Sequence, residues 1–175
     1  ARAVLSENMT ELTQVEEIFA QQPPSPTPMH YGSRLVFDGE DHVYITTGEH
    51  FTEEERHYAQ DMDKTYGKIV RLTPGGAVPE DNPFAGQGMP QAQVWSLGHR
   101  NVQGAAMRPG TDELWIIEHG PQGGDELNLI EAGANYGWPD VTYGENYDGT
   151  PVTSGDYRHE EAGFTPPRYY WDPVI

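Results

Sequence analysis

Short runs of apolar and β-branched residues, separated by turn residues, dominate the chain. Each run is bounded by Gly, Pro, Asp or Asn, and the turn signals Asp38-Gly39 and Pro109-Gly110 lie between runs. Runs of this length and composition are typical of β-strands. The five clearest are residues 34–37 (RLVF), 42–47 (HVYITT), 68–72 (KIVRL), 93–97 (QVWSL) and 113–117 (ELWII). The pattern predicts an antiparallel all-β protein.

Two segments depart from this pattern. Residues 51–64 (FTEEERHYAQDMDK) begin with a Thr and three Glu, which suits a helix start, but they lack an apolar stripe. We expect a polar loop there with one or two helical turns. Residues 21–28 (QQPPSPTP) contain four prolines, so we expect them to be extended or irregular.

A weak internal repeat points to the architecture. The text at 37–50 resembles that at 107–120, and a third strand follows each copy, at 67–72 and 125–130. The loop after the second strand is long in the first copy and short in the second. Repeated four-stranded units with variable loops on one face predict a β-propeller, with a β-sandwich as the competing arrangement.

The length of the chain limits how many units it holds. About two to three such units fit, whereas a propeller closes with about four to eight blades. Residues 169–175 (YYWDPVI) look like the entry into a further strand. We therefore expect residues 1–175 to form one partial propeller domain, a fragment of a longer chain.

Composition and charge exclude several classes of protein. With 10 basic and 28 acidic residues the net charge is −18, so the basic footprint of a nucleic-acid binder is missing. No apolar run approaches the ~20 residues of a membrane span. The chain has no Cys, which excludes disulfides, thiolate metal sites and cysteine nucleophiles. Its N-terminus lacks the basic and apolar regions of a signal peptide.

The first candidate site pairs His30 with Glu49. In an antiparallel pair of strands, residues at the far ends can meet, so Glu49 could approach His30. A carboxylate bound to one imidazole nitrogen fixes the tautomer and raises the basicity of the other nitrogen, which makes a general base. The alternative is a polar loop His beside a surface Glu.

Two further clusters are rich in glycine. In residues 97–104 (LGHRNVQG), flanking glycines let the backbone approach a ligand and Arg100 offers a planar fork, although a structural corner is the alternative. Residues 118–128 (EHGPQGGDELN) and 133–139 (GANYGWP) combine carboxylates with tight turns. These oxygens suit Ca²⁺, although the loop is no EF-hand and an ordinary acidic turn is the alternative.

Together these motifs resemble the soluble glucose/sorbosone dehydrogenases, aldose sugar dehydrogenases that use pyrroloquinoline quinone (PQQ). The motifs that carry the resemblance occur in family order within residues 29–139: HYGSRLVF, YITTGE, GKIVRLTPGG, LGHRNVQG, EHGPQGGDELNLI and GANYGWP. The resemblance implies a six-bladed β-propeller of roughly twice this length, in a periplasmic or secreted protein.

The resemblance also implies roles for single residues. His30 matches the family's catalytic base, and Glu49 stands where the family carries an acidic partner for it. Arg100 and Asn101 match the pair that contacts PQQ, with Arg100 placed to stabilise charge on the reduced quinone. Tyr147 is expected near the cofactor, although its surroundings match poorly.

Two calcium sites are implied in the same way. Gly120 and Pro121 match backbone carbonyl ligands of the Ca²⁺ that holds PQQ. Glu126 and Tyr136 look like ligands of a second, structural Ca²⁺.

The function implied is oxidation of aldose sugars at the anomeric carbon to lactones, with PQQ and Ca²⁺ as cofactors and an external electron acceptor. Other cofactor-binding residues of the family fall outside this chain, so we expect it to be inactive by itself. The alternatives are a non-catalytic propeller-type module that binds carbohydrate or protein, and a sugar-lactone hydrolase.

Overall fold

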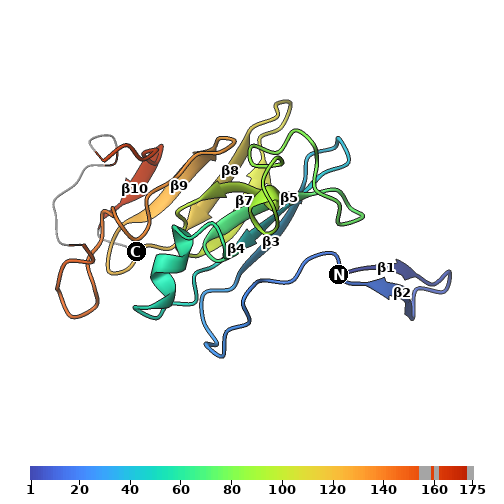
Figure 1. The fold of residues 1–175 in the computed structure, drawn as a ribbon, viewed down its shortest axis with the longest axis horizontal. Helices are drawn as coiled ribbons and strands as arrows, with labels where there is room; N and C mark the ends of the chain where they lie inside the picture. Colours follow the sequence, from blue (N-terminus) through green and yellow to red (C-terminus); the bar gives the residue numbers. More distant parts are fainter. Residues whose placement is uncertain (154–158, 160–161, 173–175) are drawn as a thin grey trace.

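The chain folds into two four-stranded antiparallel sheets that pack face to face (Figure 1). The computed structural model describes residues 1–153, 159 and 162–172. In the first sheet, the strands lie in the order β3 (Gly32–Phe37), β4 (Val43–Thr47), β5 (Lys68–Leu72) and β6 (Val94–Leu97). In the second sheet, the order is β10 (Tyr169–Trp171), β9 (Asp125–Ile130), β8 (Leu114–Glu118) and β7 (Val102–Met107).

The internal repeat predicted this arrangement. Strands β4 and β8 are the second strands of their sheets, and β5 and β9 are the third. The long loop of the first copy contains the 3₁₀ helix η1 (Glu55–Ala59), as expected for the polar segment after Phe51. A second 3₁₀ turn, η2 (Gln91–Gln93), leads into β6.

Four strands differ from the prediction. Residues 169–171 of the expected strand entry form β10, which completes the second sheet beside β9, while residues 173–175 lie outside the described residues. Strand β7 was missed because its Gly and two Ala have low strand propensity. The hairpin of β1 (Arg2–Leu5) and β2 (Leu12–Glu16) was also missed: it is fully exposed, so no burial pattern marks it, and it projects from one end of the molecule (Figure 1).

The core between the sheets follows the two-residue period of the strands. Tyr44 of β4 and Ile69 of β5 point toward the second sheet, where they meet Leu114, Ile116 and other apolar residues of β7 to β9. Alternate residues of a strand face opposite sides of the sheet, so the neighbours of Tyr44 and Ile69 point away from this core.

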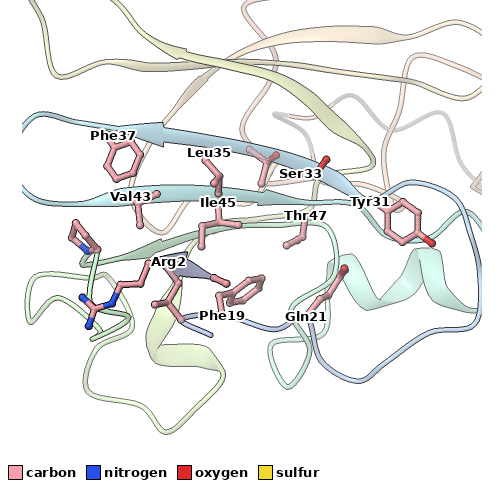
Figure 2. Close-up of a pocket in the computed structure, with 14 residues that line it drawn as sticks. Arg2, Phe19, Gln21, Tyr31, Ser33, Leu35, Phe37, Val43, Ile45 and Thr47 are labelled. Atoms are coloured by element: carbon pink, nitrogen blue, oxygen red, sulfur yellow. The ribbon is translucent and has the colours of Figure 1, made fainter. Parts of the chain in front are cut away.

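The opposite face of the first sheet carries a second apolar layer. Val43, Ile45 and Val70 lie there and pack against Phe19 of the N-terminal segment. Nearer the edge, Leu35 and Phe37 of β3 remain 57% and 61% exposed. Figure 2 shows Leu35 and Phe37, together with Val43, Ile45 and Phe19, along an open pocket of about 400 Å³.

A buried lysine anchors the long loop of the first sheet. The Lys68 ammonium donates hydrogen bonds to the carbonyl oxygens of Tyr58, Ala59 and Tyr66, at 2.8, 2.9 and 2.8 Å. Burial lowers the pKa of Lys68 to about 7. These contacts fix the end of η1 against β5.

The helical turns of the described residues are too short and polar to cross a lipid bilayer.

Candidate active site

The structure brings His30 and Glu49 into direct contact. The Nδ1 atom of His30 lies 2.7 Å from Oε1 of Glu49. Glu49 is buried, and its other oxygen accepts the backbone N–H of Phe51 at 2.7 Å. The His30 side chain is 14% exposed, and its Nε2 makes no hydrogen bond among the described residues. The pair therefore presents one free nitrogen of an oriented imidazole.

The backbone around this pair is close-packed and strained. A Cβ atom on Gly48 would lie 1.7 Å from the carbonyl oxygen of His30, so only glycine fits between the two segments. Four non-glycine residues nearby have positive φ: His30 (52°), Ser33 (76°), His50 (70°) and Phe51 (77°). Such conformations cost about 1 kcal/mol or more each and cluster where function demands a fixed geometry.

The Arg100-Asn101 segment interlocks with the His30–Glu49 pair. The backbone N–H of Glu49 donates to the carbonyl of Arg100 at 3.0 Å. The side-chain oxygen of Asn101 accepts the N–H of Gly32 at 3.2 Å. Two segments that the sequence treated as separate clusters therefore form one site.

The guanidinium of Arg100 is buried beside this pair. Its Nη1 donates to the carbonyl oxygens of Gly120 and His119, at 2.6 and 3.2 Å. Burial lowers the pKa of Arg100, while the negative charge of Glu49 acts in the opposite direction. The site thus places a fixed guanidinium beside an oriented imidazole.

A second guanidinium, Arg56, was missed by the sequence analysis. The guanidinium carbons of Arg56 and Arg100 lie 5.8 and 5.2 Å from the centre of the Trp138 ring. Nη1 of Arg56 donates to Asn146 at 3.2 Å. The Nε atoms of both arginines are buried without a hydrogen-bond partner among the described residues. Arg56 lies in η1, whose run of charged residues indicated only a solvated loop.

Aromatic side chains border the base. The ring of Phe51 stands edge-on to His30, with centroids 5.1 Å apart, and lies 6.4 Å from the ring of Tyr147. Tyr147 is 64% exposed. The structure therefore places Tyr147 at the rim of the site, and Phe51 between it and the base.

The carbonyls proposed for the first calcium site lie on a tight turn. The N–H of Gly120 donates to Oδ1 of Asp125 at 2.7 Å, and a Cβ on Gly120 would lie 2.3 Å from the carbonyl oxygen of Gly123. Gly120 and Pro121 are both buried. The Gly120 carbonyl accepts from Arg100, which joins this turn to the site.

Glu126 and Tyr136 line one small cavity, which Arg100 and Gly120 also line. Burial and the neighbouring Glu118 raise the pKa of Glu126 well above its ordinary value. The amide nitrogen of Asn128 donates to both carboxylates, while its oxygen is buried without a partner among the described residues. The Tyr136 hydroxyl is already engaged, since it donates to the carbonyl of Leu129 at 2.6 Å. Within the described ranges, no three His, Asp or Glu side chains gather to hold a metal.

Comparison with known proteins identifies the family. The profile of the Glucose / Sorbosone dehydrogenase family matches residues 1–175. The chain belongs to this family.

Relatives of known name or structure extend the comparison. Aldose sugar dehydrogenase YliI of Escherichia coli (strain K12) is 45% identical over 169 residues, which cover 95% of this chain and 44% of that protein. The crystal structure of the apo soluble aldose sugar dehydrogenase of E. coli superposes with a TM-score of 0.87 at 44% identity, over 97% of this chain and 48% of that one. The PQQ-bound aldose sugar dehydrogenase of Streptomyces coelicolor gives a TM-score of 0.62 at 36% identity, over 82% of this chain and 36% of that one.

These matches confirm the predicted fold class. The two sheets are two blades of the β-propeller of this family, and the sandwich alternative is wrong. The chain spans less than half the length of YliI.

Proposed function

We propose that this chain supplies the base and the guanidinium of a site that oxidises aldose sugars at the anomeric carbon, with PQQ and Ca²⁺ as cofactors. The supporting observation is the His30–Glu49 contact of 2.7 Å, with a free imidazole nitrogen beside the buried Arg100. Membership of the dehydrogenase family supports the class of reaction.

His30 is suited to accept the proton of the anomeric hydroxyl. Because Nδ1 is bound to Glu49, the neutral ring carries its proton there and presents the lone pair of Nε2. The Glu49 carboxylate then stabilises the imidazolium that forms. Phe51, packed edge-on against the ring, limits its rotation and excludes water from one side.

The residues around Arg100 fit an anionic planar cofactor. Two guanidiniums share one indole, and their buried Nε atoms have no acceptor among the described residues. Carboxylates such as those of PQQ would supply acceptors and offset the repulsion between the cations. When bound, the quinone supplies an acceptor for the two electrons removed from the sugar.

The donor sets also fit a hard cation. Gly120 and Pro121 would hold the Ca²⁺ of the cofactor through carbonyl oxygens, the ligand type that Ca²⁺ prefers. The Gly120 carbonyl accepts one hydrogen bond from Arg100 and would use its second lone pair for the cation. Beside Glu126, the buried Asn128 oxygen has no donor among the described residues, and the Glu118 carboxylate lies close by. A Ca²⁺ there would stabilise the two buried carboxylates. Since the Tyr136 hydroxyl is engaged, only its backbone carbonyl remains for a ligand role.

A chimaera provides the test. We expect the isolated chain, supplied with PQQ and Ca²⁺, to reduce no dye with glucose, because it spans only 44% of YliI. Replacing the matching part of YliI with this chain should restore turnover. In that chimaera, His30→Ala should lower kcat roughly 10²- to 10⁴-fold, the usual contribution of a general base.

The matched control is His57→Ala, which alters an exposed histidine of η1. It should leave turnover unchanged. Full activity of the His30→Ala chimaera would exclude His30 as the base, and sugar binding without any oxidation in the parent chimaera would favour a binding module. Robust turnover by the isolated chain would contradict its expected inactivity.

A further inference from the structure

His50, which follows Glu49, ties two segments of the site together. The ring is 4% exposed, and its Nδ1 lies 3.1 Å from the carbonyl oxygen of Thr27. Its Nε2 lies 3.0 Å from the side-chain oxygen of Gln21. Figure 2 shows Gln21 reaching toward the end of β4, near Thr47. Both partners of His50 thus belong to the N-terminal segment that leads into His30.

The orientation of the Gln21 amide follows from its second contact. Its Nε2 donates to the carbonyl oxygen of Gly48 at 2.9 Å. Since a carbonyl can only accept, the amide nitrogen must face Gly48 and the amide oxygen must face His50. The chain of hydrogen bonds therefore ends at a carbonyl acceptor on both sides, Gly48 and Thr27.

Only one protonation state of the His50 ring satisfies both of its hydrogen bonds. Both ring nitrogens of His50 face acceptors, so each must carry a proton to make its hydrogen bond. Either neutral tautomer would set a nitrogen lone pair against an oxygen at about 3 Å, with the cost of a buried unmade bond. The imidazolium satisfies both contacts.

The surroundings of the ring favour a cation. The Tyr31 and Tyr66 rings lie 5.1 and 4.9 Å from the His50 ring, within the range of cation–π attraction. Burial opposes ionisation of the partly buried Glu55 carboxylate of η1, but hydrogen bonds from three hydroxyl groups lower its pKa, and its charge interaction with His50 lowers it further. Glu49, the adjacent residue, is a second carboxylate, and it is buried.

We infer that His50 is an imidazolium that clasps the segment carrying His30 to the turn carrying Glu49, and so acts as a positioning residue for that pair. Through Gln21 it holds the carbonyl of Gly48, next to Glu49. Through Thr27 it holds the chain three residues before His30. Only the relevance of this clasp to sugar oxidation rests on the function proposed above.

The ring state can be measured on the 175-residue chain without cofactor or sugar. Nitrogen-15 NMR of the imidazole distinguishes an imidazolium, with two similar protonated nitrogens, from a neutral ring, with two dissimilar ones. At pH 7 we expect both nitrogens of His50 to be protonated. A neutral ring whose contacts to the N-terminal segment persist would overturn the inference.

Hydrogen exchange reports on the clasp itself. The Gln22 amide donates to the Thr65 hydroxyl at 2.7 Å and marks the attachment of the N-terminal segment. As the pH rises and His50 loses its proton, the protection factor of this amide should fall roughly tenfold, the effect of losing one charge-assisted hydrogen bond.

Two variants separate a charged clasp from mere packing. In His50→Gln the protection of Gln22 should be low at every pH and show no step, whereas His57→Gln on the exposed face of η1 should keep the wild-type step. The same pH step in His50→Gln would overturn the inference. Because the ring measurement uses the wild-type chain, the inference stays testable even if His50→Gln does not fold. Failure of sugar oxidation would leave all these readouts unchanged.

Discussion

Two histidine–glutamate pairs stand at corresponding ends of the two blades. His30 and Glu49 meet just beyond β4, and His99 contacts Glu118 at the end of β8, with Nδ1 3.0 Å from the carboxylate. The second ring has no exposed surface, its Nε2 contacts the Ser96 hydroxyl at 2.9 Å, and it stacks on Tyr136. In the first pair the corresponding nitrogen has no hydrogen-bond partner in the part of the chain that the structure describes.

The difference shows that the carboxylate–imidazole contact alone does not mark a base. Both pairs fix a ring by the same bond, but His99 has both of its nitrogens occupied and cannot reach a substrate. Glu118 also accepts the backbone N–H of Arg100 at 2.6 Å, so this second pair acts as a structural brace for the backbone of Arg100. The pair that leaves a nitrogen open is therefore the one that we propose as the base.

The largest expected effect is a loss of stability when the second pair is disrupted at Glu118. Glu118→Gln places an amide N–H against one of three donors: His99, Asn128 or the backbone of Arg100. Breaking such a buried charged network should lower the free energy of unfolding by about 3 kcal/mol. Urea denaturation of the isolated chain measures this loss. An unfolding free energy within error of the wild type would show that Glu118 is not a brace.

Glu49→Gln should instead act mainly on rate. The amide no longer holds the His30 tautomer or stabilises its cation, so kcat in the YliI chimaera should fall roughly 100-fold. Its effect on the free energy of unfolding should be smaller than that of Glu118→Gln. Dye-reduction kinetics and urea denaturation of the two variants, measured together, test this contrast. Equal losses of stability and unchanged kcat would erase the distinction between the pairs.

The smallest expected effect is the pH dependence of the stability that Glu55 contributes near the His30–Glu49 pair. Burial opposes ionisation of Glu55, but hydrogen bonds from Ser25, Thr52 and Thr27 lower its pKa below the ordinary 4.5. A lowered pKa means that the carboxylate stabilises the fold above pH 4.5, and that this contribution disappears as the pH falls through the lower value.

Glu55→Gln should therefore cost roughly 1 kcal/mol of unfolding free energy at neutral pH and nothing once the wild-type carboxyl is protonated. Urea denaturation at neutral and acidic pH compares the two proteins. Glu53→Gln, which alters an exposed neighbour, is the control and should show no such difference. A constant gap between Glu55→Gln and wild type at every pH would contradict the expectation.

Much of the fold could be read from local pattern. Strands such as β4 and β5 alternate or concentrate β-branched residues between turn signals, and the repeat matched them to β8 and β9. Strand β7 and the β1–β2 hairpin were missed because neither carries that signal: β7 contains small residues, and both strands of the hairpin are exposed. Strand β10 pairs with β9 across a long connection, which no local pattern reveals.

The candidate site was predictable in part for a related reason. The His30–Glu49 contact followed from hairpin geometry, and the motifs around Arg100 carried a resemblance. Arg56 and His50 were missed because their importance depends on contacts across the fold, with Trp138 in one case and Gln21 in the other. Spacing along the chain cannot report such contacts.

Because Gly48 has no side chain, its close contact with His30 limits which substitutions position 48 tolerates. The backbone of His30 occupies the space that any Cβ there would need, at 1.7 Å. A saturation library at codon 48 of the YliI chimaera should therefore return glycine alone among active clones, whatever the sugar used for selection. Efforts to redesign specificity are better spent on neighbours such as Tyr147, which is 64% exposed.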